Sequence, residues 1–267
     1  MIKVSLFASS KRPMLYPALF KSLKATSVEY EVVFAGPLSR EEIQRYYPVG
    51  EKFHFFTTEN IKPAQCYEIA RRNCHGETVV WIADDCEFPN DVIGKAYNYW
   101  KSKNNEKLIL SIQTKESGYR NEKGSLFNMD DHRFFGFDKT TPLMAPLGMM
   151  SKEYLNTLGG IDRRFVCGQY ENDIVMRAYA DGGKVEIFGG EDCFIDIDHL
   201  RKSYEAKEIT SEIEFLRRPF AAGYQIDRKV LEGNWINSFI KKPVFEPFEE
   251  KDLYTKSQSN NIHQRWE

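Results

Sequence analysis

The feature that most constrains this chain is the alternation of short apolar runs with amphipathic segments over residues 1–113. Residues 78–83 (Thr-Val-Val-Trp-Ile-Ala) are the most telling run, because an uninterrupted apolar strand is typical of a parallel sheet covered on both faces. Expected strands occupy residues 2–7, 30–35, 52–57, 78–83 and 108–112. Expected helices lie between them, over residues 14–23, 41–46, 63–74 and 91–101. This order predicts an α/β fold with a mainly parallel sheet and right-handed crossovers.

The pattern changes after residue 113. Residues 115–146 mix Gly, Asn, Asp, Lys and aromatic residues without a period, which predicts a long surface loop. Order returns with a helix after Ser151 and a second helix from about Glu171 to Gly182-Gly183, followed by strands over 184–188 and 193–197. The remaining residues are first charged and helical, then rich in Pro and Phe, and finally polar.

Composition limits the class of protein. The 37 Lys and Arg residues balance 39 Asp and Glu residues, so the net charge of −2 gives no electrostatic case for a dedicated nucleic-acid binder, although a local basic strip is compatible with it. No segment approaches the roughly 20 apolar residues of a membrane helix, and the first residues lack the pattern of a signal peptide. Five cysteines without paired spacing indicate reduced thiols. We therefore expect a soluble, cytoplasmic protein. The cysteines are Cys66, Cys74, Cys86, Cys167 and Cys193.

Three segments carry candidate chemistry, and the first is the acidic run after the strand at 78–83. Asp84 and Asp85 follow this strand directly, where open α/β sheets place their ligands. Adjacent carboxylates repel one another, so they need either a cation or raised pKa values. A hard divalent ion such as Mg²⁺ or Mn²⁺ prefers such oxygen ligands. Acidic residues also favour a helix N-terminus, which explains the same pair without a metal.

The second and third segments each have a structural explanation beside the functional one. Glu171 and Asp173 stand at an expected helix start, where either carboxylate could deprotonate an acceptor hydroxyl. Helix capping and an i,i+4 ion pair between Asp173 and Arg177 account for the same residues. His199 follows the last expected strand and could supply an imidazole ligand to a metal, although a single histidine there is also compatible with a structural or solvated role.

Together, the three segments resemble the GT-A glycosyltransferases of family 2 in order and spacing. The resemblance extends roughly from residue 2 to residue 202. It rests on the strand and loop at 4–12, on Ala83-Asp84-Asp85 as a version of the family's D-x-D, on Leu158-Gly159-Gly160-Ile161-Asp162, on Tyr170-Glu171-Asn172-Asp173, and on His199. The spacing of Asp162, Asp173, Arg177 and Gly182 makes the combination more specific than any one motif.

The resemblance implies a GT-A domain over residues 1–202, with a Rossmann-like nucleotide-sugar half at 1–113 and an acceptor half at 114–202. Residues 203–267 form an extension that could act as a lid or contact an acceptor or a second copy of the chain. A mostly parallel sheet flanked by helices is the fold expected. The oligomeric state stays open, a homo-oligomer included.

It also implies metal-dependent transfer of a sugar from a nucleoside-diphosphate sugar, most simply a UDP-sugar, to an acceptor hydroxyl with inversion. Mn²⁺ or Mg²⁺ would be the cofactor. Residues 7–12 would line the nucleoside, Asp85 and His199 would bind the metal, and Asp84 would contact the ribose or a metal-bound water. Glu171 or Asp173 would be the base, and alignment on Arg177 favours Glu171. The nucleotide-binding set is Phe7, Ala8, Ser9, Arg12, Gln65 and Asp84.

The sequence also departs from the family pattern. The second strand ends in Phe34-Ala35-Gly36-Pro37, without the usual Asp, so that Glu59 or Gln65 would have to recognise the base. Arg71 and Arg72 are expected on the solvent face of their helix. A nucleotide-sugar-forming nucleotidyltransferase is an alternative, although Ala8-Ser9-Ser10 lacks the glycines of a triphosphate loop. A catalytically idle sugar-binding or scaffolding domain is another. The acceptor could be a glycan, a lipid-linked sugar, a protein or a modified nucleic-acid base.

Overall fold

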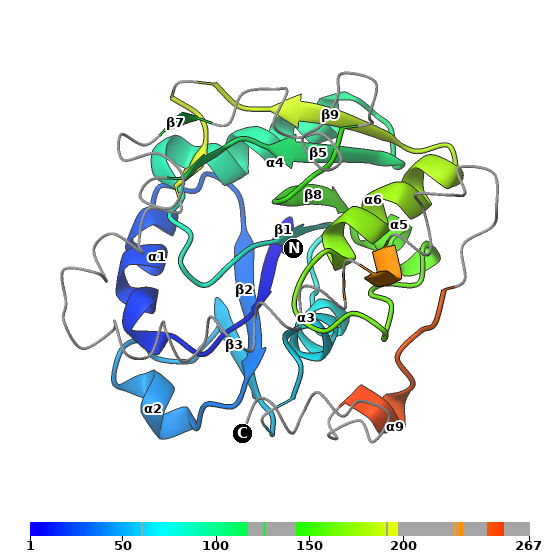
Figure 1. Ribbon diagram of the computed structural model, residues 1–267. Coiled ribbons are helices and arrows are strands. Elements are labelled where there is room, and N and C mark those ends of the chain that lie inside the picture. Colours follow the sequence, from blue (N-terminus) through cyan, green and yellow to red (C-terminus); the bar gives the residue numbers. More distant parts are fainter. Residues whose placement is uncertain are drawn as a thin grey trace.

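A seven-stranded sheet with the order β3-β2-β1-β4-β8-β5-β9 forms the centre of the molecule (Figure 1). The computed structural model describes residues 1–59, 61–116, 125–126, 143–190, 192–196, 227, 229–231 and 245–253. β8 is antiparallel to both of its neighbours, whereas the other strand pairs are parallel. The predicted mostly parallel α/β sheet is therefore confirmed. The strands are β1 Val4–Ser9, β2 Tyr30–Gly36, β3 Phe53–Thr57, β4 Thr78–Trp81, β5 Leu108–Ile112, β8 Gly148–Ser151 and β9 Lys184–Phe188.

Helices cover both faces of this sheet. In Figure 1, α1 and α2 lie to the left of β1, β2 and β3, and α3 lies to their right with α5 and α6 above it. α3 begins at Pro63, which has no backbone N–H to lose and is favoured in the first turn of a helix. The helices are α1 Tyr16–Leu23, α2 Arg40–Gln44, α3 Pro63–Arg72, α4 Val92–Ser102, α5 Lys152–Thr157, α6 Tyr170–Ala180 and α9 Glu250–Leu253.

A second, three-stranded sheet has the order β10-β6-β7. β6 (Thr114–Glu116) follows β5 almost directly, and β10 (Ile195–Asp196) pairs with it in parallel. β7 (Ser125–Leu126) pairs with β6 in the antiparallel sense. Residues 115–146, expected as an irregular loop, therefore contain two short strands, and most of the remainder of that segment lies outside the described residues.

Aromatic side chains fill the core between α1 and the sheet. The Phe20 and Tyr47 rings stack with centroids 3.8 Å apart, and the Tyr16 and Phe53 rings meet edge to face at 5.3 Å. Phe34 joins the cluster from β2. Aromatic pairs at these separations contribute about 0.5–1.5 kcal/mol each beyond the area that they bury. This packing fixes α1, and with it the loop that leads into α1 from β1.

The antiparallel strand β8 was not predicted. Gly-Met-Met-Ser has no β-branched residue, so its sequence carries little strand signal. Gly148 is required here because a Cβ atom at this position would lie 2.2 Å from the Trp81 ring. The Trp81 indole is fully buried, and its Nε1–H donates to the carbonyl oxygen of Ala145 at 3.0 Å.

Within the part of the chain that the structure describes, no helix combines the length and the apolar character needed to cross a bilayer.

Candidate active site

The acidic segment forms a tight turn at the carboxyl end of β4. The Ile82 amide still donates to the Phe7 carbonyl at 3.0 Å, which extends the pairing with β1 by one residue. The Cys86 amide then donates to the Ala83 carbonyl at 3.2 Å. This bond closes a four-residue turn with Asp84 and Asp85 at its two central positions. Both carboxylates are thereby held at the edge of the sheet where the sequence analysis predicted them.

Arg12 binds both carboxylates of this turn. Its Nε lies 2.9 Å from Oδ1 of Asp84, its terminal guanidinium nitrogen also contacts Asp84, and the same nitrogen lies 3.1 Å from Oδ2 of Asp85. Burial by itself would lower the pKa of Arg12, but the two carboxylates raise it above its normal value. One guanidinium group therefore offsets part of the charge of the acidic pair and joins the loop after β1 to the turn after β4.

Asp84 is almost fully engaged by protein donors. It is 4% exposed, and Oδ2 accepts hydrogen bonds from the Ser10 hydroxyl at 2.7 Å and from the Lys11 and Arg12 amides at 3.3 Å each. Together with the Arg12 guanidinium, these donors occupy both carboxylate oxygens. Asp84 thus holds the loop after β1 in place, and its expected contact with a ribose or a metal-bound water stays a prediction.

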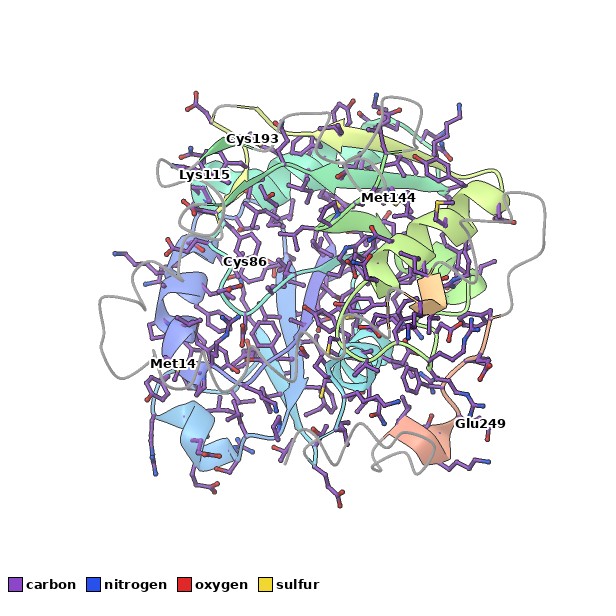
Figure 2. The ribbon with its side chains drawn as sticks, in the orientation of Figure 1. Met14, Cys86, Lys115, Met144, Cys193 and Glu249 are labelled. Carbon is purple, nitrogen blue, oxygen red and sulfur yellow. The ribbon has the colours of Figure 1, made fainter. Side chains whose placement is uncertain are left out.

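The third segment of the sequence reaches the same turn. Backbone hydrogen bonds join Glu87 and Asp196 in both directions, at 2.6 and 2.9 Å. In Figure 2, Cys86 marks the acidic turn, and Cys193 and Lys115 mark the neighbouring chain before β10 and in β6. The structure therefore brings β10 next to the acidic turn. His199 lies outside the described residues, so its role as a ligand stays a prediction.

The Asp85 carboxylate is the one part of the expected metal site that the structure describes. Its side chain is 12% exposed, and carboxylate oxygens are the ligands that Mg²⁺ and Mn²⁺ prefer. Among the described residues, no group of three or more His, Cys, Asp and Glu side chains is arranged to hold a metal. A metal site at Asp85 would therefore need ligands from outside this part of the chain, such as His199, or from a bound diphosphate.

β1 extends to Ser9, two residues beyond its expected end, into the segment that was expected to line the nucleoside. Phe7 and Ala8 belong to β1 and are fully buried, and the Phe7 ring packs edge to face on Tyr67 at 6.1 Å. Only their backbone can line a nucleoside. Ser9 and Arg12 are partly exposed, so their side chains are available to a ligand. Gln65 is fully buried, and its Oε1 accepts the Lys62 amide at 3.1 Å, which caps α3.

Two carboxylates begin α6, and Asp173 serves as an anchor. It is 1% exposed, and Oδ2 lies 2.8 Å from Nε of Arg177, which confirms the predicted i,i+4 ion pair. Arg177 also donates to the carbonyl oxygens of Leu158 and, at 2.6 Å, Gly160. The backbone of Gly160 has φ of +79°, a conformation that favours glycine. The pair therefore fixes the Gly-Gly turn that the sequence singled out.

Glu171 is in a different environment. It is partly buried, and among the described residues no basic side chain lies within ion-pair distance of its carboxylate. Burial, and to a smaller extent the Asp227 carboxylate, raises the pKa of Glu171 to about 7. A carboxylate with a pKa near the working pH is suited to accept a proton during a reaction. Of the two candidate bases, Glu171 therefore has the more suitable environment.

Two tyrosines connect Glu171 to the acidic turn. The Tyr67 hydroxyl, on α3, donates to the Ile82 carbonyl at 2.5 Å, and its ring lies 4.9 Å from the ring of Tyr170, the first residue of α6. Burial raises the pKa of Tyr67, and the charges of Asp84 and Glu171 both add to this effect. Tyr67 therefore contacts both the end of β4, just before the acidic turn, and the first residue of α6, just before Glu171.

Sequence reasoning missed Tyr67, Asp227 and the true position of Arg71. The expectation that Arg71 faces solvent is wrong, because it is buried and donates to both oxygens of Glu68, at 2.8 and 2.7 Å, and to Asn156 at 2.5 Å. The i,i+3 spacing of Glu68 and Arg71 was the available signal. The sequence carries no comparable signal for Tyr67, whose role depends on a contact with α6.

A separate cavity of about 370 Å³ lies at the opposite end of β4. Gly76 and Glu77, just before the strand, line it together with Trp100 and Ser151. Because the acidic turn follows β4 and this cavity precedes it, the two are distinct places. Open α/β folds bind ligands outside the carboxyl ends of their strands, so the acidic turn is the better candidate site.

The comparisons with known proteins identify the fold. No family model and no curated protein matches the sequence. Solved structures of Staphylococcus aureus TarS residues 1–349 do match. The complex with UDP has 13% identity and a TM-score of 0.55, with 73% of this chain and 60% of that chain covered. The complex with UDP-GlcNAc has 14% identity and a TM-score of 0.56, with 73% and 58% covered.

A third TarS structure, without a ligand in its description, matches over 90% of this chain and 76% of that chain, with 13% identity and a TM-score of 0.54. The chain spans 60% of the length of the UDP complex. At these identities the likeness concerns the fold. The chain therefore shares the α/β fold of these TarS structures, built on a mostly parallel sheet with flanking helices.

Proposed function

We propose that this protein is a glycosyltransferase that moves a sugar from a nucleoside-diphosphate sugar to an acceptor hydroxyl. The observation that carries the proposal is the link that Tyr67 makes between two acidic segments. Its hydroxyl donates to the Ile82 carbonyl just before the Asp84-Asp85 turn, and its ring contacts Tyr170, the residue before the partly buried Glu171, whose pKa is about 7. The first group suits a diphosphate and its cation, and the second suits removal of a proton.

Glu171 is the proposed base. Its carboxylate accepts the proton of the acceptor hydroxyl as that oxygen attacks the anomeric carbon, while the bond from that carbon to the diphosphate oxygen breaks. Attack opposite the leaving group inverts the anomeric configuration. Base catalysis of this kind contributes about 10²–10⁴-fold to the rate. Asp173 is less suitable because Arg177 holds its carboxylate in a buried ion pair.

Asp85 and His199 are the proposed ligands of Mn²⁺ or Mg²⁺. When bound, such an ion stabilises the charge that develops on the leaving diphosphate. Arg12 lies against Asp84 and Asp85, so a bound diphosphate would share the positive charge of Arg12 with these two carboxylates. Backbone atoms of Phe7 and Ala8 and the side chains of Ser9 and Arg12 would line the nucleoside.

A UDP-sugar is the proposed donor, because structures of the same fold have been described with UDP and with UDP-GlcNAc. The test is to incubate the protein with UDP-, GDP- and dTDP-sugars and to measure release of the nucleoside diphosphate, with Mn²⁺ and with EDTA. We expect UDP release that depends on Mn²⁺. Absence of release from every donor, or release of pyrophosphate from UTP instead, would contradict the proposal.

A further inference from the structure

A carboxylate from the C-terminal part of the chain is buried beneath the start of α6. Asp227 is fully buried. Its Oδ1 accepts the Val166 amide at 2.6 Å, and its Oδ2 accepts the Cys167 and Gly168 amides at 2.7 and 2.8 Å. Hydrogen bonds to a charged acceptor are about twice as strong as those between neutral groups. One side chain thus binds three consecutive backbone amides that lie some sixty residues earlier in the sequence.

The loop that Asp227 binds, residues 166–168, leads directly to the proposed base. Its other side is held by α3, because the Ala64 amide donates to the Val166 carbonyl at 3.0 Å. After Gly168, the backbone passes through Gln169 with φ of +61° and enters α6 at Tyr170. Glu171 is therefore three residues beyond the last amide that Asp227 holds. Any movement of this loop would change the position of the Glu171 carboxylate.

Asp227 also contributes to the charge around Glu171. Burial raises the pKa of Asp227 to about 6, although the three amides and Lys62 oppose that shift. The ionised form near neutral pH adds to the raised pKa of Glu171. Among the described residues, Asp227 also acts on Cys167 and Tyr170, which burial keeps neutral, and on Lys62. Lys62, on the α3 side, is also buried, and its pKa is lowered to about 8.

We propose that Asp227 is a positioning residue of the active site, which holds the 166–168 loop so that α6 presents Glu171 to the acceptor. The C-terminal segment thereby completes the site in addition to the role of lid or contact surface expected from the sequence. This inference rests on the proposed function for its catalytic part. The effect of the Asp227 hydrogen bonds on the 166–168 loop can be measured without substrate.

The first test is hydrogen–deuterium exchange of the full chain without ligand. Asp227→Asn replaces one acceptor oxygen with an NH₂ group that faces amide donors, so we expect at least tenfold faster exchange in a peptide that covers residues 166–168. Lys229→Gln, at an exposed position two residues further on, is the matched control and should exchange like the wild type. Unchanged exchange at 166–168 in Asp227→Asn would overturn the inference, whatever the activity.

The second test separates positioning from general stability through the pH profile of UDP release. In Asp227→Asn we expect kcat to fall by about 10–100-fold, as misplacement of a catalytic group does, with UDP affinity within about twofold of the wild type. Loss of the neighbouring charge should also move the acidic limb of the profile to lower pH. A merely structural role would lower kcat and leave that limb near pH 7, which would overturn the inference.

Asp227→Glu supplies an independent check and serves as the main variant if Asp227→Asn does not fold. It keeps the negative charge but moves both acceptor oxygens outward by one methylene. We therefore expect faster exchange at 166–168 and a lower kcat, with the acidic limb unmoved. Wild-type kcat and exchange in this variant would overturn the inference. If the wild type releases no UDP, the proposed function fails, and the exchange experiment still decides whether Asp227 holds the loop.

Discussion

The carboxylates of the acidic turn after β4 and those at the start of α6 differ in their partners. In the turn, Arg12 binds both Asp84 and Asp85, so that each of these carboxylates has a basic partner. At the start of α6, Arg177 balances Asp173 only, and burial raises the pKa of Glu171 to about 7. The comparison teaches that the partner of a carboxylate, more than its place in a motif, decides whether it is a fixed charge or a proton acceptor.

The largest expected effect concerns the carboxylate without a basic partner among the described residues. Glu171→Gln keeps the size of the side chain and removes the base, so transfer should fall by about 10²–10⁴-fold. UDP affinity measured by calorimetry should stay within about twofold. Asp173→Asn, assayed at a temperature where it is folded, is the comparison variant and should lose much less turnover. Equal turnover in the wild type and Glu171→Gln would place the base elsewhere.

A second prediction concerns the acidic turn, the other region of the comparison. Asp85→Asn removes a charged oxygen ligand, so the gain in UDP affinity on adding Mn²⁺ should fall by at least about tenfold. Calorimetry of UDP binding with Mn²⁺ and with EDTA measures this gain. Glu51→Gln, at an exposed position at the start of the turn before β3, should behave like the wild type. An undiminished gain in Asp85→Asn would exclude Asp85 as a metal ligand.

The third prediction concerns stability and contrasts a buried ion pair with an exposed one. Removing one partner of the buried Asp173–Arg177 pair leaves an uncompensated charge, so Asp173→Asn should lower the free energy of unfolding by about 3 kcal/mol. The Lys107–Asp181 pair is equally short, at 2.8 Å, but both side chains are almost half exposed. Asp181→Asn should therefore cost at most about 1 kcal/mol. Similar losses in urea unfolding of the two variants would show that Asp173 is not an anchor.

A fourth prediction concerns the dependence of stability on pH. The pKa of Glu171 is raised from 4.5 to about 7, so the folded protein binds the proton more tightly than the unfolded chain does. Its contribution to the free energy of unfolding is therefore greatest below pH 4.5 and is lost as the pH rises to about 7.

Glu171→Gln removes this dependence. Relative to the wild type, the variant should gain about 2 kcal/mol between pH 5 and pH 8, and urea unfolding at the two values measures the gain. Asp227 contributes in the same direction between 3.8 and about 6, and it is unchanged in this variant. A stability difference between variant and wild type that is the same at both pH values would contradict the raised pKa of Glu171.

The helices and strands that were predictable are those whose hydrophobic pattern has the period of the structure that the backbone adopts. The apolar run that became β4 and the amphipathic pattern that became α3 were identified close to their observed bounds. β8 was missed because its sequence has no period, and its place depends on the fit of Gly148 against Trp81, distant in sequence. Arg71 was placed on the wrong face because its partner Asn156 comes from a later helix.

In the candidate site, the carboxylates and the local Asp173–Arg177 pair were predictable, but the contacts between distant segments were not. Asp84, Asp85, Glu171 and Asp173 follow from their positions at strand and helix ends. The contact between Arg12 and Asp84 joins residues 72 positions apart, so no local pattern predicts it. The i,i+4 spacing of Asp173 and Arg177 was visible in the sequence, whereas the burial that raises the pKa of Glu171 was not.

The most direct measurement is a crystal structure of Glu171→Gln with UDP-GlcNAc and Mn²⁺, since this variant should bind the donor without turning it over. The account predicts the diphosphate beside Asp85 and the sugar between the turn after β4 and the start of α6, with the substituted side chain at position 171 facing the anomeric carbon. A donor bound away from Asp85, or one whose anomeric carbon faces away from position 171, would contradict the claim that these two acidic segments serve one reaction.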